Sequence, residues 1–265
     1  MIRPVFGNTA TVRTRRGFVL RGGGWGGVRL RVRCGLINHP KWGPVLIDAG
    51  YGPRASQGPG RSWPLRVYAR MVGMKLNPLE SPLAMLADHG FLPEDVKLVL
   101  LTHLHADHVS YLRDLPEARF VVDTQVTGPL RHGVFTELLP ADFAARCVNI
   151  TDHATADLPF GMGQAFDVLG DGSALAVPLP GHLKGHYGLC FPGDTPLLYA
   201  ADVQWLRDAV VQDRVPGFPA SLVADDAKAA TESVAFARRF VREGGDLVLC
   251  HNPATTPYDW TPTDV

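Results

Sequence analysis

The chain has 265 residues, of which 46% are apolar and 20% charged, and its 26 basic side chains balance 26 acidic ones. This length fits one large domain or two small ones with a buried core, and the balanced charge argues against nucleic acid or a membrane surface as the main partner. The sequence lacks an apolar run of roughly 18 residues, a signal-peptide h-region and a C-x-x-C pair, which fits a cytoplasmic protein in a reducing compartment.

The N-terminal part of the chain reads as a strand preceded by a glycine-rich turn. Residues 28–34 alternate apolar side chains with Arg29, Arg31 and Arg33, which is the period of a half-buried strand with a solvated arginine face. The run 21–27 contains a G-x-G-x-x-G match, but a strand follows it where a dinucleotide site needs a helix. A hairpin loop is therefore expected there.

Further elements lead up to a histidine-rich segment. Residues 44–50 form a short apolar strand that stops at Asp48, which we interpret as a turn or supporting residue. Residues 51–79 are rich in glycine, proline and aromatics and predict a long functional loop. A helix is expected over 82–89, followed by a buried strand over 96–101.

The second half of the chain alternates short strands with one clear helix. The predicted helix spans 225–242, with acidic residues in its first turn and arginines in its last. The stretch 128–160 is less regular and is expected to hold cap or lid elements. The predicted strands are 118–123, 166–169, 174–178, 187–191, 197–201 and 247–250. Residues 1–265 are thus expected to form one layered domain, with loop or lid insertions near 51–80 and 128–160.

The run T-H-L-H-A-D-H at 102–108 places three imidazoles and one carboxylate in six residues. Imidazole nitrogen and carboxylate oxygen are ligands for transition metals such as zinc. His103 and His105 are two apart in an extended segment, so their side chains can project the same way. Asp107 and His108 follow directly, and the motif predicts a metal site at the end of a strand.

Three later strand ends carry further candidate ligands. His182 lies in a P-G-H segment after the strand 174–178, Asp202 follows the strand 197–201, and His251 follows the strand 247–250. A single histidine or aspartate at a strand end is usually a hydrogen-bonded loop residue. Repetition of the same pattern three times favours partners for the histidine motif.

These motifs together resemble the metallo-β-lactamase superfamily, and the resemblance runs roughly from residue 35 to 251. It implies an α+β fold, the four-layer αββα sandwich, and a centre of two divalent transition metal ions, with zinc the best candidate and iron, manganese or cobalt also compatible. Carried over to this chain, the first metal would be held by His103, His105 and His182. The second would be held by Asp107, His108 and His251, with Asp202 bridging the two.

The resemblance also implies how such a centre reacts. Two metals held together can share a hydroxide made from water, which attacks a carbonyl or phosphoryl group. Asp107 would act catalytically as a proton shuttle. His186 also has a family counterpart and is interpreted as a supporting or structural residue around the ligands. The remaining histidines, His39, His89, His132 and His153, match no motif, and hydrogen-bonding roles are expected for them.

Within the superfamily the pattern is closest to N-acyl homoserine lactone lactonases. Related di-iron oxidoreductases carry glutamate in place of His105, and antibiotic-hydrolysing members usually lack the aspartate found here at Asp202. The loop after Gly50 and the segment from Asp202 through the V-P-G-F run at 215–218 resemble the lactonases. One departure is Trp205, because lactonases place a tyrosine there. Trp205 is interpreted as a substrate-binding residue or a pocket wall.

The expected function is therefore opening of a lactone or cleavage of a small ester, with N-acyl homoserine lactones, the signals removed in quorum quenching, as candidate substrates. Alternatives with the same centre are a phosphodiesterase or phosphotriesterase and another ester or thioester hydrolase. A non-catalytic metal-binding protein is a weaker alternative, since all seven ligand positions are filled. The expected partners are a small-molecule substrate and a second copy of the chain, contacting through the 51–80 loop; no nucleic-acid or membrane partner is expected.

Overall fold

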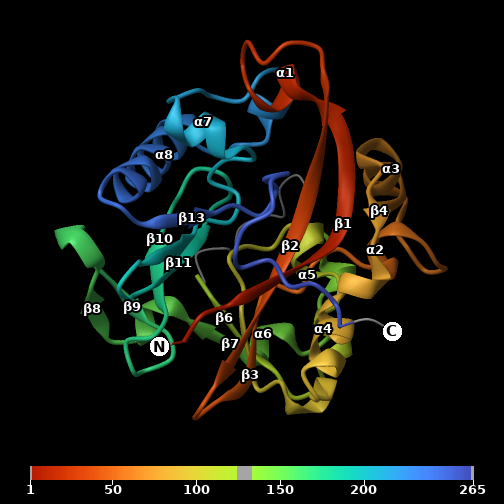
Figure 1. Ribbon diagram of the computed structural model, residues 1–265. Helices are drawn as coiled ribbons and strands as arrows, with labels where there is room; N and C mark the ends of the chain where they lie inside the picture. The colour runs from red at the N-terminus through yellow and green to blue at the C-terminus, as the bar shows by residue number, and fades with distance from the viewer. Residues whose placement is uncertain (1, 124–132, 264–265) are drawn as a thin grey trace.

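Two β-sheets lie at the centre of the molecule with helices outside them, as Figure 1 shows for the computed structural model. The structure describes residues 2–123 and 133–263. Buried side chains from the strands of both sheets contribute a large part of the main apolar core, and the surrounding helices and loops contribute the rest. This arrangement confirms the predicted α+β class and the αββα layering.

The first sheet has the strand order β4-β1-β2-β3-β5-β6-β7 in the described residues. Strands β1 to β3 pair antiparallel as a meander, whereas β3, β5, β6 and β7 run parallel. Its strands are β1 (Val5–Arg15), β2 (Gly27–His39), β3 (Gly43–Ile47), β4 (Lys75–Leu76), β5 (Leu98–Leu100), β6 (Arg119–Val122) and β7 (Cys147–Asn149).

The second sheet has the order β13-β12-β11-β10-β9-β8, again in the described residues. All its neighbours pair antiparallel except β12 and β13, which are parallel and are connected through the longest helix. Its strands are β8 (Thr155–Asp157), β9 (Gln164–Asp167), β10 (Leu175–Pro178), β11 (Tyr187–Phe191), β12 (Leu197–Tyr199) and β13 (Asp246–Val248). The predicted bounds of β9 to β13 all lie within two residues of the observed ones.

The predicted C-terminal helix is α8 (Ala227–Arg242), which starts two residues later than expected because Asp226 caps it. The Asp226 carboxylate accepts hydrogen bonds from the N–H groups of Lys228 and Ala229, satisfying two donors that a helix start leaves free. The other α-helices are α1 (Arg16–Val19), α2 (Pro53–Ser56), α3 (Trp63–Val72), α4 (Pro82–Asp88), α5 (Ala106–Val109), α6 (Phe143–Arg146) and α7 (Arg207–Val211). Not one of the described helices has the length and hydropathy needed to cross a bilayer.

Two elements differ from the sequence-based expectation. Strand β1 was not predicted, because polar side chains interrupt its apolar period; Asn8 and Thr9 are nevertheless buried, since both bond to the backbone of Val32. The segment 51–79 contains α2 and α3 rather than a loop alone. The Ser62 hydroxyl caps α3 and Gly73 ends it in the left-handed conformation, which are ordinary helix boundary signals.

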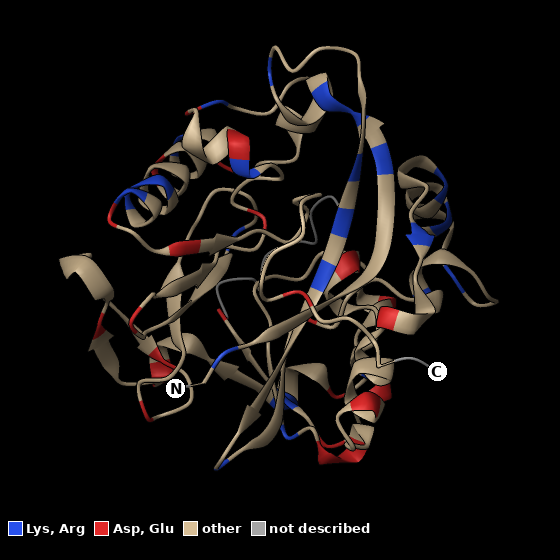
Figure 2. Ribbon diagram, in the orientation of Figure 1, with Lys and Arg blue, Asp and Glu red and all other residues tan. Residues whose placement is uncertain are grey.

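The hairpin reading of the glycine-rich run 21–27 is confirmed, because β1 and β2 pair antiparallel on either side of it, with Arg15 opposite Gly27. Basic side chains recur along β2, as Figure 2 shows. Arg29 is exposed, as expected for a solvated face, but the same expectation is wrong for Arg33.

Arg33 is fully buried, and its guanidinium reaches the segment that follows β13. Its Nη1 donates to the carbonyls of Leu249 and Asn252 at 3.1 and 2.7 Å, and its Nη2 donates to that of Ala254 at 2.7 Å. Its Nε and Nη2 donate to Asp259 Oδ1 and Oδ2 at 2.7 and 3.1 Å. Every direction in which a buried guanidinium can donate is thus used, which is what allows a charge in this position.

We expect Arg33→Met to lower the free energy of unfolding by about 3–5 kcal/mol, because the change leaves a largely buried carboxylate and several carbonyls without their donor. Urea unfolding of the purified protein measures this. Arg29→Met, on the exposed part of the same strand, is the matched control and should change stability by at most about 0.5 kcal/mol. Equal effects of the two substitutions would contradict the structural role of Arg33.

Candidate metal centre

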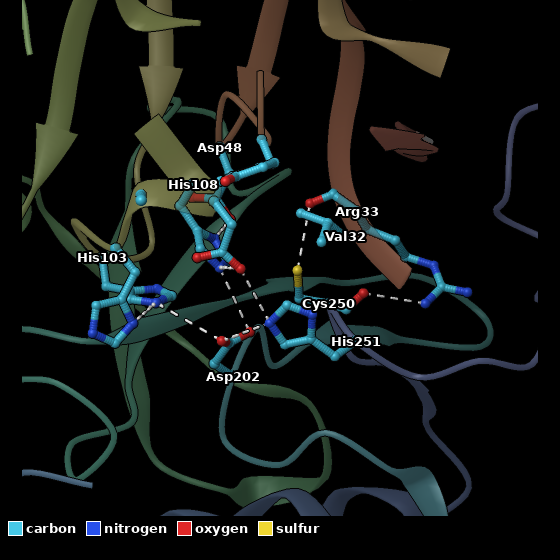
Figure 3. Close-up of polar contacts among 12 residues, drawn as sticks. Val32, Arg33, Asp48, His103, His108, Asp202, Cys250 and His251 are labelled. Atoms are coloured by element: carbon cyan, nitrogen blue, oxygen red, sulfur yellow. Dashed lines mark hydrogen bonds and ion pairs between the residues drawn. The ribbon is translucent and has the colours of Figure 1, made fainter. Parts of the chain in front are cut away.

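The seven predicted ligands come together at the ends of four strands. His103, His105, Asp107 and His108 follow β5, where the chain turns into α5. The other three come from the second sheet: His182 after β10, Asp202 after β12 and His251 after β13. All seven side chains are buried. Figure 3 shows His103, His108, Asp202 and His251 pointing toward one another.

The first cluster contains His103, His105, His182 and Asp202, with one ligand atom of each within 4.8 Å of all the others. His105 Nδ1 lies 3.0 Å from His103 Nε2 and 3.0 Å from His182 Nε2. Asp202 Oδ2 lies 3.5 Å from His182 Nε2. Three nitrogens and one oxygen gathered in this way are the donor set of a four-coordinate divalent metal.

The second cluster forms on the other side of Asp202. Asp202 Oδ2 lies 3.0 Å from His251 Nε2, and its Oδ1 lies 3.7 Å from His108 Nε2. Asp107 Oδ2 lies 3.3 Å from His251 Nε2. The four residues whose ligand atoms all lie within 4.8 Å of one another are His108, Asp202, Cys250 and His251, so this group contains the buried thiol of Cys250, which no motif marks, and not the predicted ligand Asp107. The only sequence signal for Cys250 is its place beside His251.

The polar atoms of these clusters fit two divalent metal ions that share Asp202. His108 Nε2 and Asp202 Oδ1 are buried and have no hydrogen-bond partner among the described residues. A buried polar atom without a partner costs about 1–3 kcal/mol, and a bound cation removes that cost. Two ions, one in each cluster, would give both atoms a partner.

The electrostatics differ between the clusters. Burial and the neighbouring imidazoles hold the pKa of His103 and that of His182 well below the usual range, so both rings are neutral and ready to coordinate. Burial would also lower the pKa of His108 and His251, but nearby carboxylates raise both well above the usual range. The imidazoles of His103 and His182 are therefore unprotonated, whereas those of His108 and His251 carry protons in the metal-free protein.

The two carboxylates are ionised. Burial would raise the pKa of Asp107, but His108 and His251 lower it to about 2. Burial likewise opposes ionisation of Asp202, and the same two histidines nevertheless hold its pKa well below the usual range. Asp202 thus presents negative oxygens to both clusters, and Asp107 presents one to the second cluster.

Asp48 holds the second cluster from behind, in line with its interpretation as a supporting residue. Its Oδ2 accepts a hydrogen bond from His108 Nδ1 at 2.8 Å, which leaves His108 Nε2 facing the cluster. Its Oδ1 accepts from the backbone N–H and the hydroxyl of Thr102 at 2.9 and 3.0 Å. The hydroxyl of Tyr199 adds a further bond to Oδ2 at 3.2 Å. Asp48 therefore holds the ring of His108 in place, because it is itself bonded to Thr102 after β5 and to Tyr199 on β12.

His186 is buried beside the ligands but lies outside both clusters. Its Nδ1 donates to the carbonyl of Leu179 at 2.7 Å, and its Nε2 accepts from the backbone N–H of Asp202 at 3.2 Å. Burial lowers its pKa to about 4, so the ring is neutral and Nε2 can accept. This geometry gives His186 a part in holding the Asp202 backbone.

The other histidines lie away from the clusters. His39 Nε2 is 2.9 Å from Asp171 Oδ2, and His89 Nδ1 is 2.8 Å from the carbonyl of Met85. His153 is half-buried, and His132 lies outside the described residues.

Trp205 lies half-buried at the edge of the centre. Its ring centroid is 6.4 Å from that of His251, and the two planes meet at 75°. Together with His182 and Asp202 it lines a cavity. The structure thus puts the predicted substrate residue beside both clusters.

The close approach of α8 explains the glycine of the P-G-H segment. Gly181 has a φ of +122°, and a Cβ there would lie 2.1 Å from the backbone nitrogen of Ala230 on α8. Only glycine allows the helix this close, and the approach fixes the loop that carries His182.

The family model of the metallo-beta-lactamase superfamily matches residues 27–243. The match covers more than half of the chain, so the chain belongs to this superfamily. The curated relatives include an N-acyl homoserine lactonase AttM from Azorhizobium caulinodans, 28% identical over 229 residues, which are 84% of this chain and 82% of that protein. An AttM from Agrobacterium fabrum is 28% identical over 197 residues, covering 71% of this chain and 70% of the relative.

Solved structures share the fold. An AiiA variant from B. thuringiensis with N-decanoyl-L-homoserine bound at the active site has a TM-score of 0.68 at 18% identity, covering 94% of this chain and 92% of its own. A probable metal-dependent hydrolase from Staphylococcus aureus has a TM-score of 0.70 at 17% identity, with coverages of 95% and 89%. AidC, described as a dizinc quorum-quenching lactonase in complex with a product, has a TM-score of 0.62 at 12% identity, with coverages of 100% and 95%.

We expect metal uptake at neutral pH to release protons, because His108 and His251 hold theirs until a metal replaces them. Because both pKa values are raised, protons compete with the metal at these two rings, and metal affinity should fall as the pH is lowered. Calorimetric titration of metal-free protein in two buffers with different ionisation enthalpies counts the protons, and about two per chain are expected. A binding heat that does not depend on the buffer would contradict the assignment.

Asp48→Asn should weaken metal binding about 10–100-fold, because the amide no longer favours the His108 orientation that presents Nε2. The dissociation constant of the more weakly held metal, measured by competition with a chelator, reports the effect. Asp171→Asn is the control, since it changes an exposed carboxylate that pairs with another buried histidine, His39, away from the clusters. If Asp48→Asn and Asp171→Asn bound the metal with similar affinity, the supporting role of Asp48 would be ruled out.

Proposed function

We propose that this chain is a dinuclear-metal-dependent hydrolase that opens the ring of N-acyl homoserine lactones. The assignment as a hydrolase is supported by the Asp202 carboxylate, which two buried ligand clusters share. The choice of a lactone substrate is supported by a relative named N-acyl homoserine lactonase and by structural neighbours that hold N-acyl homoserine products.

The proposed roles follow from the two clusters. His103, His105 and His182 would hold one metal, Asp107, His108 and His251 would hold the other, and Asp202 would belong to both donor sets. Such a pair of ions would supply an activated water and polarise the carbonyl under attack.

Asp107 is the residue we propose to move the proton. Its carboxylate stays ionised and faces the second cluster, with Oδ2 within 3.3 Å of His251 Nε2. It can therefore accept a proton from the attacking water and pass it to the ring oxygen that leaves when the lactone opens. Trp205 would bind substrate as a wall of the cavity, with its indole N–H as a single donor.

The cavity beside the centre favours a lactone over a phosphate ester. Its lining is mainly apolar, and the charged side chains on it include Asp213 as well as Arg21 and Arg214. The Arg214 guanidinium already donates to Gln212 Oε1 at 3.2 Å. A phosphodiester would need concentrated positive charge here, so we rank the phosphodiesterase second.

Three finer proposals concern metal, location and assembly. Zinc is our choice of metal, because imidazole and carboxylate donors suit it. A cytoplasmic location is supported by the four free cysteines of the chain. A second copy is our candidate partner for α3, which exposes Trp63 and Met71 with 73% and 80% of their surface.

The test is hydrolysis by metal-loaded protein, with acyl homoserine lactones, aryl esters and phosphodiesters compared on one sample. We expect the lactones to be the best substrates. His103→Ala combined with His105→Ala should reduce ring opening by more than about a hundredfold, because it removes two donors of one metal. His89→Ala, an exposed histidine outside the clusters, is the matched control. Lactone turnover that survives loss of both ligands, or is undetectable in the wild type, would refute the proposal.

A further inference from the structure

Two tyrosines of the 51–79 segment have hydroxyl groups without a hydrogen-bond partner among the described residues. They are Tyr51, which follows the turn after β3, and Tyr68 on α3. By contrast, the hydroxyls of Tyr187, Tyr199 and Tyr258 each donate to a protein oxygen. A phenol left unpaired in or near the interior is uncommon, because a buried hydroxyl without a partner destabilises the fold. Both groups are therefore candidates for a functional role.

Tyr51 is held against the helix that carries the second-cluster ligands. The carbonyl of Gly50 accepts from the N–H of Ser110 at 3.1 Å, and the N–H of Ala49 donates to the carbonyl of His108 at 2.6 Å. These bonds tie the turn after β3 to α5. The side chain of Tyr51 is 0% exposed, so its hydroxyl is closed to a substrate.

Tyr68 approaches the histidine motif through Phe135 and Gly133. Its ring centroid lies 5.2 Å from that of Phe135. The carbonyl of Gly133 accepts from the N–H of Ala106 at 2.9 Å, and a Cβ on Gly133 would lie 3.0 Å from the ring of His105. Tyr68 is half-buried, so it keeps access to solvent beside the ligands. A substrate bound at the centre can therefore reach this phenol.

The charges around Tyr68 are those of the second cluster. Burial raises the pKa of its hydroxyl well above the usual range, the Asp107 carboxylate raises it further, and His108 opposes the shift. The phenol therefore stays protonated at neutral pH. It offers an O–H donor on the side of the centre where Asp107 lies.

We propose that Tyr68 is a catalytic residue that donates a hydrogen bond to the ring oxygen of the lactone as the ring opens. The inference rests on the lactonase function proposed above. In that reaction the oxygen of one water molecule adds to the carbonyl carbon, the ring C–O bond breaks, and its electron pair goes to the ring oxygen. Asp107 carries a proton from the water to this oxygen. Tyr68 keeps its own proton and stabilises the negative charge that develops before the transfer is complete.

The test compares Tyr68→Phe with the wild type on N-hexanoyl homoserine lactone and on the corresponding homocysteine thiolactone, which differ in a single ring atom. The ring sulfur is a weak acceptor and leaves as a less basic anion, so it gains little from a phenol donor. We expect kcat for the lactone to fall by about a hundredfold, as for loss of one donor to a developing oxyanion. The kcat for the thiolactone should fall by at most about threefold. A purely structural role of the phenol would lower both values equally.

A second measurement does not depend on turnover. The ring-opened product N-hexanoyl homoserine carries the former ring oxygen as a hydroxyl, and its binding to metal-loaded Tyr68→Phe should weaken by about threefold to tenfold, as seen by calorimetry. Tyr258→Phe is the matched control, since it removes a hydroxyl that bonds to Asp246 on β13. That variant should change neither the ratio of lactone to thiolactone turnover nor the affinity for the product.

Equal losses on lactone and thiolactone in Tyr68→Phe would overturn the assignment, and so would unchanged turnover of both substrates with unchanged affinity for the product. Failure of the proposed function would look different, because the wild type would then open neither ring.

Discussion

The contact on which the site depends is that of the Asp202 carboxylate with two groups of buried imidazoles. One oxygen lies 3.5 Å from His182 Nε2 and 3.0 Å from His251 Nε2, so a single side chain joins ligands delivered by different strands. Buried imidazole nitrogens and carboxylate oxygens packed this closely are the donor sets of divalent transition metal ions. The dinuclear centre follows from this packing, and the hydrolytic chemistry follows from the centre.

The candidate ligands are held in place by residues outside the two clusters. Asp48 orients the ring of His108, and His186 accepts from the backbone N–H of Asp202. Arg33 binds carbonyls on both sides of His251 and pairs with Asp259. Each is a buried polar group whose bonding capacity is used, and each constrains one strand end. The centre is thereby fixed by the same hydrogen bonds that join the two sheets.

Much of this site could be predicted from the sequence, because ligand chemistry is local. The motif at 102–108 and the strand ends before His182, Asp202 and His251 carry their signal in a few neighbouring residues. Arg33 could not be placed, since its burial depends on carbonyls more than two hundred residues away. The cavity that Trp205 and α8 line was also missed. Side chains on one face of α8 form one of its walls, and their spacing is that of any amphipathic helix, so the sequence alone does not reveal the cavity.

The most direct test of the account is a crystal structure of zinc-loaded protein with anomalous difference data collected at the zinc edge. The account predicts two peaks per chain. One should lie among His103, His105 and His182 and the other among Asp107, His108 and His251, with Asp202 contacting both. A single peak, or peaks away from these side chains, would contradict the dinuclear centre.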